Sequence, residues 1–190
     1  MTERVHFLPV DLRIHRSKVI DLNVEYMEWV AKGVSEHFKI DLFAIVGTSA
    51  REYITSTLDK LLSEISSGGI YYLVKLEGAL IGMGALRQIR KKTGEIKRMY
   101  IQPSFRGKGY GKALLRQLLH KAMESGYRTV YLDSARFMIA AHHLYRSSGF
   151  VERDEYPETE VPRQIRSHWL FMEKILEDPA KQNRACHILR

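Results

Sequence analysis

Apolar residues recur at helical spacing in four parts of the chain, where positions three and four apart share one face of a helix. This pattern predicts helices over residues 17–38, 49–65, 109–125 and 137–147. Gly126 and Gly149 follow the last two helices at positions where helices commonly end. Each helix therefore has one apolar face to bury and one polar face for solvent.

Stretches rich in β-forming residues alternate with these helices. They predict strands over residues 5–14, 70–76, 79–89, 95–101, 129–132 and 169–175. Tight turns at Glu77-Gly78 and Thr93-Gly94 join three of the strands into a β-meander. Pro9 interrupts the first strand, and Pro103, which has no N–H to donate, helps to end the strand 95–101.

A meander followed by strand–helix alternation predicts an α/β or α+β fold, with a mixed sheet flanked by helices. A chain of 190 residues usually forms one domain and buries a core without disulfides. We therefore expect one domain over residues 1–176 and a basic tail over 177–190.

Composition and charge narrow the class of protein. Hydrophobic residues at 45% and charged residues at 27% are ordinary for a soluble domain. The sequence has no apolar run near the roughly 18 residues of a membrane span, and residues 1–5 lack the layout of a signal peptide. The single cysteine, Cys186, cannot form an internal disulfide, which favours a reducing, cytoplasmic location.

The formal net charge of +8 favours polyanionic partners, although it is equally compatible with a simple role in solubility. The densest basic stretch, 87–92, has four basic residues and is interpreted as a solvated connection between strands. The chain shows neither aromatic-basic interleaving nor a recognition-helix signature, so we expect no nucleic-acid partner and no membrane partner.

The most informative segment is the turn Arg106-Gly107-Lys108-Gly109-Tyr110-Gly111, which links a strand to a helix. Glycines permit positive φ and close approach of a ligand, and successive N–H groups at a helix start can bind phosphate. A plain connection is the alternative. The spacing matches neither the Gly-x-Gly-x-x-Gly of dinucleotide-binding folds nor the Gly-x-x-x-x-Gly-Lys-Ser/Thr of P-loops.

The pattern Arg106-x-x-Gly109-x-Gly111, after a strand that ends at Ile101, resembles the acetyl-CoA signature of the GNAT N-acetyltransferase superfamily. Farther on, residues 141–150 (AHHLYRSSGF) resemble the family's second landmark, Ala-x-x-Leu-Tyr-x-x-x-Gly-Phe. The two landmarks occur in the expected order, and the resemblance covers about residues 70–175. Met138 departs from it, because many members carry asparagine there.

The resemblance implies a mostly antiparallel mixed sheet. It also implies that acetyl-CoA is the co-substrate and that its acetyl group is transferred directly to a primary amine of a small molecule or protein. It assigns cofactor binding to the glycine turn, the preceding strand and the second landmark. The residues concerned are Met99, Tyr100, Ile101, Arg106, Gly107, Lys108, Gly109, Tyr110, Gly111, Lys112 and Ala141.

The resemblance also suggests catalytic groups. Tyr145 corresponds to the family tyrosine that protonates the departing thiolate, although it is otherwise an ordinary packed tyrosine. Glu95 lies where the histone-acetyltransferase branch carries a base, but an ion pair with Arg98, Lys97 or another arginine, with ordered water as the base, is the alternative. His142 and His143 are adjacent on a helix and point in different directions, so we expect no metal site.

The acceptor is less constrained. Residues 151–160 carry five carboxylates and form either an acidic rim beside the acceptor or a solvated hairpin. Tyr26 and Trp29 are expected on another wall of the site. A non-catalytic coenzyme A sensor on the same fold is an alternative function. We expect the protein to be either a monomer or a homodimer.

Overall fold

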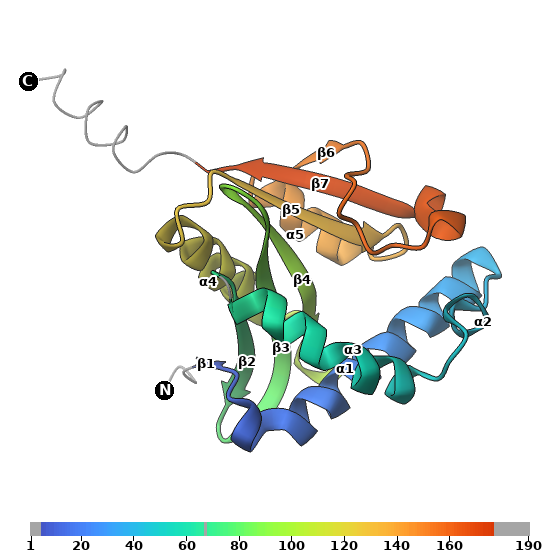
Figure 1. Cartoon of the computed structure of the whole chain (residues 1–190), viewed down its shortest axis with the longest axis horizontal. Helices are drawn as coiled ribbons and strands as arrows, with labels where there is room; N and C mark the ends of the chain where they lie inside the picture. Colours follow the sequence, from blue (N-terminus) through green and yellow to red (C-terminus); the bar gives the residue numbers. More distant parts are fainter. Residues whose placement is uncertain (1–4, 67, 177–190) are drawn as a thin grey trace, which may run out of the picture.

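The computed structural model describes residues 5–66 and 68–176, so the expected basic tail lies outside the described residues. Strands and helices alternate along the chain (Figure 1). The strands are β1 (His6–Pro9), β2 (Ile70–Leu76), β3 (Ala79–Arg90), β4 (Thr93–Ile101), β5 (Thr129–Ala135), β6 (Val151–Arg153) and β7 (Trp169–Ile175). The α-helices are α1 (Leu12–Phe38), α2 (Leu42–Val46), α3 (Ala50–Ser66), α4 (Tyr110–Glu124) and α5 (Ile139–Ser147), with short 3-10 helices at Pro103–Phe105 and Arg163–His168.

The seven strands form one sheet in the order β1-β2-β3-β4-β5-β7-β6, which confirms the expected mixed, mostly antiparallel architecture. The pair β4–β5 is parallel, and the other neighbours are antiparallel. β4 pairs with β5 only from Thr93 to Ile96, although both strands continue beyond this point. The two halves of the sheet therefore diverge there, as Figure 1 shows.

Helices cover both faces of the sheet, because successive side chains of a strand point to opposite faces. Tyr72 and Val74 of β2 pack in the same core cluster as the apolar face of α4. The intervening Tyr71 and Leu73 pack in a second cluster with Val19, Leu22 and Leu58 of α1 and α3. The predicted apolar faces of these helices thus meet the sheet.

Several predicted boundaries are correct, and the differences have local causes. β2 and β7 have the predicted bounds. The strand predicted over 5–14 is wrong beyond Pro9, because Asp11 accepts a hydrogen bond from the backbone N–H of Arg13 and caps a helix that begins at Leu12. The sequence analysis also missed α2, which Asp41 caps, and the edge strand β6.

Candidate active site

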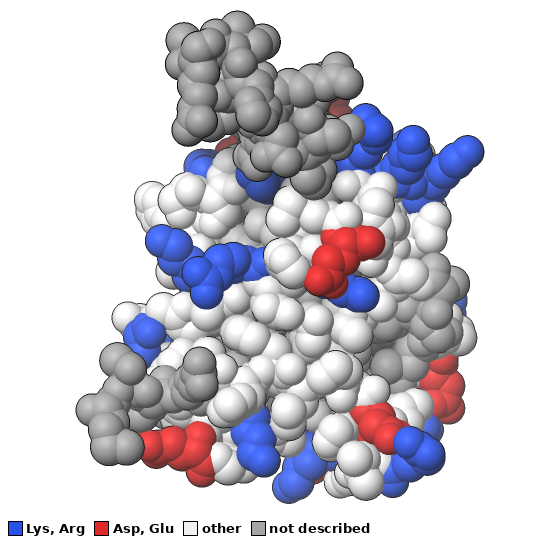
Figure 2. Space-filling view, turned by 90° about the vertical axis from the view of Figure 1, so that its left-hand side faces the viewer, with Lys and Arg blue, Asp and Glu red and all other residues white. Residues whose placement is uncertain are grey.

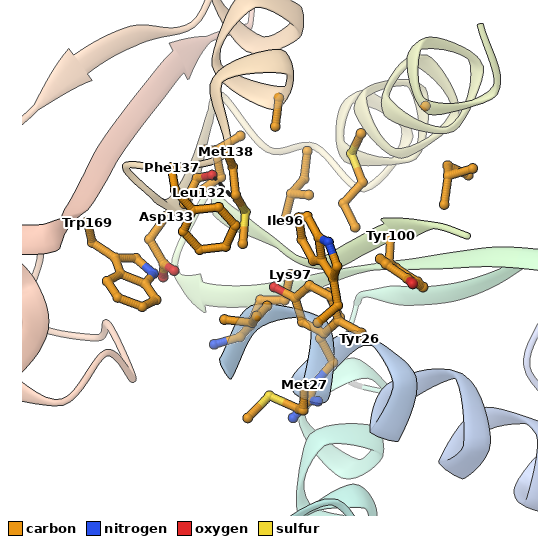
Figure 3. A pocket seen from close by; sticks show the side chains of 18 of the residues that line it. Tyr26, Met27, Ile96, Lys97, Tyr100, Leu132, Asp133, Phe137, Met138 and Trp169 are labelled. Carbon is orange, nitrogen blue, oxygen red and sulfur yellow. Dashed lines mark hydrogen bonds between the residues drawn. The ribbon is translucent and has the colours of Figure 1, made fainter. Parts of the chain in front are cut away.

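A cavity of about 530 Å³ opens where β4 and β5 diverge (Figure 3). Its walls come from α1, α2, β4, the glycine turn, β5, α5 and residues 160–169. Most of the residues assigned to the cofactor by resemblance line it: Met99, Tyr100, Ile101, Arg106, Gly107, Tyr110, Gly111 and Ala141. Lys108, Gly109 and Lys112 belong to the same turn and helix start but are not among the lining residues.

The glycine turn has the conformation that an anion cradle requires. Gly107 has φ +77° and Gly109 has φ +85°, and a Cβ at either position would meet no atom within 4 Å. Gly109 is the N-cap of α4, so the first N–H groups of this helix lack partners within the helix. This backbone is open to a phosphate, and the residues present therefore fit coenzyme A.

β4 carries a bulge beside this turn. Met83 of β3 pairs with Tyr100 and Ala85 pairs with Lys97, so β4 has one more residue than β3 in this interval. Arg98 lies in the bulge with φ +53°, and its guanidinium donates to Oδ1 of the buried Asn23 over 2.8 Å. The bulge is therefore tied to α1 on one side and borders the cavity on the other.

Arg106 fastens the turn to the end of β4. Its Nε donates to the carbonyl oxygen of Ile101 over 2.9 Å. Its guanidinium carbon lies 4.3 Å from the ring centroid of Trp29 and 5.3 Å from that of Tyr100, within the range of cation–π attraction. Both Trp29 and Tyr26 line the cavity, as expected for the wall that they were assigned to.

Tyr145 lies on α5, lines the cavity and is 6% exposed. Its ring packs against Phe150, with 5.9 Å between centroids. Burial, together with the nearby Tyr26 and Asp133, raises the pKa of Tyr145 above its usual value. The residue therefore keeps its proton at neutral pH in the wall of the cavity.

Glu95 has a different position from the one a direct base would need. It is completely buried and is not among the cavity-lining residues. Its Oε2 lies 2.6 Å from Nε of Arg87, the residue opposite it on β3, and its Oε1 accepts a hydrogen bond from the Tyr156 hydroxyl. Its ion-pair partners are Arg87 and, at 3.9 Å, Lys97, whereas Arg98 contacts Asn23 instead.

The sequence analysis missed Asp133, a carboxylate that lines the cavity from β5. Its Oδ2 lies 3.3 Å from the Tyr156 hydroxyl and 3.4 Å from Oγ1 of Thr159. Burial raises its pKa to about 6, against the opposing effect of Lys97. The signal for it was a carboxylate directly after the predicted strand 129–132, where the sheet opens.

The acidic segment includes β6 and the start of its connection to β7, and four of its carboxylates form ion pairs, although Glu152 and Glu155 stay about half exposed. Residues 154–168 form a strap that connects β6 to β7 and contributes to the cavity wall. Glu158 pairs with Arg90 at 2.6 Å, and Glu160 pairs with Arg87 at 3.0 Å. Both arginines belong to β3 and pair with the strap, so the interpretation of residues 87–92 as a solvated connection is wrong for the buried Arg87, whereas the side chain of Arg90 is 44% exposed.

The net charge of +8 left open whether basic residues gather on one surface. Figure 2 shows Lys and Arg in separate groups on the face it presents, with uncharged surface between them. Over residues 5–66 and 68–176, we find no cluster of three His, Cys, Asp or Glu side chains that could hold a metal ion. In the same residues, every helix is too short or too polar to cross a bilayer. The cytoplasmic location and the oligomeric state stay predictions.

Comparisons with known proteins agree with this geometry. The chain is 34% identical over 102 residues to an N-acetylaspartate synthetase of Danio rerio, a match that covers 53% of this chain and 36% of the relative. It is 33% identical over 101 residues to an uncharacterized N-acetyltransferase, YjgM, of Escherichia coli, covering 51% and 60%. It is 30% identical over 128 residues to human N-acetyltransferase 8, covering 60% and 56%. The chain thus matches less than two thirds of the length of these relatives.

Solved structures share the fold. A GNAT acetyltransferase of Staphylococcus aureus superposes with a TM-score of 0.69 at 17% identity, covering 92% of this chain and all of the other. The PaiA N-acetyltransferase of Thermoplasma acidophilum, solved with coenzyme A, also gives 0.69, at 19% identity and 91% and 99% coverage. The family model described as "Acetyltransferase (GNAT) family" matches residues 34–150, more than half of the sequence. The chain therefore belongs to the GNAT family of acetyltransferases.

Proposed function

We propose that the protein moves an acetyl group from acetyl-CoA to a primary amine of a small molecule or protein. One observation carries the proposal: the cavity beside the glycine turn also contains Tyr145 and Asp133, a proton donor and a proton acceptor. A coenzyme A sensor, the alternative, needs the turn but has no use for the other two groups.

The chain's own residues suggest how the donor is held. The N–H groups of the glycine turn would bind the pyrophosphate, with Arg106 and Lys108 adding positive charge. The part of β4 beyond Ile96 has no β5 partner, so its backbone near Met99 and Ile101 can pair with the pantetheine amides. When bound, acetyl-CoA supplies a thioester that is already activated toward attack by an amine.

Side chains of the protein must carry out two proton transfers, one from the acceptor amine and one to the departing sulfur. The acceptor must lose a proton before its nitrogen forms the new C–N bond, because an alkyl ammonium has a pKa near 10.4. We assign that proton to Asp133, which faces the cavity. As the C–S bond breaks, Tyr145 gives its proton to the sulfur.

Glu95 then acts as a positioning residue. It is held by Arg87 and bonds Tyr156, and the Tyr156 hydroxyl also approaches Asp133. Glu95 thus acts on the cavity through Tyr156.

The test follows the release of free thiol from acetyl-CoA with a panel of amines. We expect amine-dependent release, and we expect Tyr145→Phe and Asp133→Asn each to lower kcat by about 10²- to 10⁴-fold with unchanged coenzyme A affinity in calorimetry. Tyr127→Phe is the matched control, because that buried tyrosine bonds the Gly68 carbonyl.

Gly109→Asp should abolish coenzyme A binding, because a carboxylate would repel the pyrophosphate. Tight binding of coenzyme A by the wild-type protein, without thiol release on any amine, would favour the sensor. Unchanged affinity in Gly109→Asp would remove the turn from the site.

A further inference from the structure

We propose that the acceptor is a primary amine carried by a large apolar group, such as an aromatic ring. It would bind between α1, α2 and the strap, with its nitrogen toward Asp133. This inference rests on the proposed function and concerns the half of the cavity on the side of α1, α2 and the strap, which we call the acceptor half.

The walls of the acceptor half are apolar. The lining residues that belong to one hydrophobic cluster include Val30, Leu42, Phe137, Val161, Ile165 and Trp169. Figure 3 shows the rings of Phe137 and Trp169 on either side of Asp133. A ligand group placed here would exchange water for apolar contacts on several sides, which is favourable only for an apolar group.

The charges around the cavity support the same class of ligand. The Lys97 ammonium lies 2.5 Å from a carboxylate oxygen of Glu160, so these two charges offset each other. Burial opposes ionisation of Glu160, but Lys97 and Arg87 outweigh it and lower its pKa to about 2. Glu160 therefore stays ionised at neutral pH and pairs with Lys97 within the cavity wall.

The other cavity-lining cations point elsewhere. The Arg98 guanidinium donates to Asn23, and its buried Nε has no hydrogen-bond partner among the described residues. Arg106 bonds the Ile101 carbonyl and stacks on Trp29 of α1, and we have assigned its charge to the pyrophosphate.

Among the described charged residues that line the cavity, Asp133 thus remains as the carboxylate that a ligand can approach. An ammonium is attracted to it, whereas a carboxylate on the acceptor would be repelled and would meet no available cation. A polyamine would have to bury further charges against apolar walls. An apolar monoamine satisfies both the charge and the lining.

The experiment compares kcat/KM for 2-phenylethylamine, ethanolamine, spermidine and aspartate by thiol release. Burial of the phenyl ring should favour 2-phenylethylamine over ethanolamine by about 10- to 100-fold. A tripeptide that begins with phenylalanine tests whether the apolar amine is a polypeptide N-terminus. Preference for the tripeptide would identify a polypeptide acceptor, and preference for 2-phenylethylamine would identify a small molecule. Both results support the inference.

A variant locates the site. Val46, partly exposed on the last turn of α2, also lines the cavity. Val46→Glu should lower kcat/KM for 2-phenylethylamine at least tenfold and leave coenzyme A affinity unchanged, while the matched control Val46→Leu keeps the preference.

Higher kcat/KM for ethanolamine, spermidine or aspartate would overturn the inference and leave the proposed function standing. An unchanged preference in Val46→Glu would also overturn it. Absence of thiol release on every amine would instead overturn the proposed function.

Discussion

The hydroxyl of Tyr156 donates a hydrogen bond to Oε1 of Glu95 over 2.5 Å, between residues 61 positions apart in the sequence. Tyr156 belongs to the strap and is completely buried, and Glu95 lies in the middle of the sheet. The same hydroxyl lies 3.3 Å from Asp133 in the cavity wall. One side chain therefore connects the buried ion pair to the proposed base.

Replacing Tyr156 with phenylalanine tests this connection. Its hydroxyl lowers the pKa of Asp133, so its removal should raise that pKa and move the acidic limb of the kcat/KM profile to higher pH. We also expect a loss of about 1–3 kcal/mol in the free energy of unfolding, because buried Glu95 loses a donor. Tyr131→Phe, with a ring centroid 5.1 Å from that of Tyr156, is the control. An acidic limb that stays in place would contradict the connection.

Asp133→Asn should stabilise the protein in a pH-dependent way. The pKa of Asp133 rises from 3.8 to about 6 on folding, so its contribution to stability is present below about pH 4 and lost as the pH rises through 6. Asparagine removes the buried charge, so the variant should gain about 3 kcal/mol over the wild type at pH 8 and about nothing at pH 4. Urea unfolding at both pH values measures the difference, and a gain that does not depend on pH would refute the assignment.

Two arginines on β3 should differ sharply in their effect on stability. Arg87 is 7% exposed and faces the fully buried Glu95, whereas the side chain of Arg90 is 44% exposed and pairs with Glu158. Arg87→Met leaves the buried Glu95 carboxylate with only the more distant Lys97, at 3.9 Å, as an ion-pair partner, which should cost about 3–5 kcal/mol. Arg90→Met removes an exposed pair and should cost less than about 1 kcal/mol. Similar costs in thermal or urea unfolding would show that the burial of Arg87 has no energetic weight.

Gly109 and Gly111 offer another matched pair. Gly109 has φ +85°, which strains any residue with a Cβ, so Gly109→Ala should lower the free energy of unfolding by about 1 kcal/mol. Gly111 lies in α4, and its Cβ would meet Cδ2 of Leu144 at an ordinary 3.7 Å. Gly111→Ala should therefore raise stability by up to about 1 kcal/mol. Equal effects would mean that the turn relaxes into another conformation.

The elements that the sequence predicts well have strong local signals. The β-meander and α4 follow from alternation, tight turns and a long apolar face. The strand predicted through Ile14 failed because Leu12 and Ile14 alternate with polar residues there, while the deciding signal is the cap at Asp11. β5 continues past Leu132 to Ala135 although Asp133 is a poor strand former, because pairing with β7 overrides local propensity.

The candidate site is predictable where it depends on motif spacing, as the glycine turn and Tyr145 show. Its acceptor side is not, because the contacts there are long-range. Arg87 pairs with Glu160, 73 positions later, and no local pattern indicates that register. The role of the acidic segment emerges only when the strap and β3 are brought together.

The strap is one continuous segment, and the family match ends at Phe150, before the strap begins. The glycine turn lies well inside that match. Insertions or exchanges within residues 154–168 can therefore change the shape of the acceptor half while the sequence of the glycine turn stays the same. Such an arrangement marks the strap as the segment to exchange in engineering a new acceptor specificity.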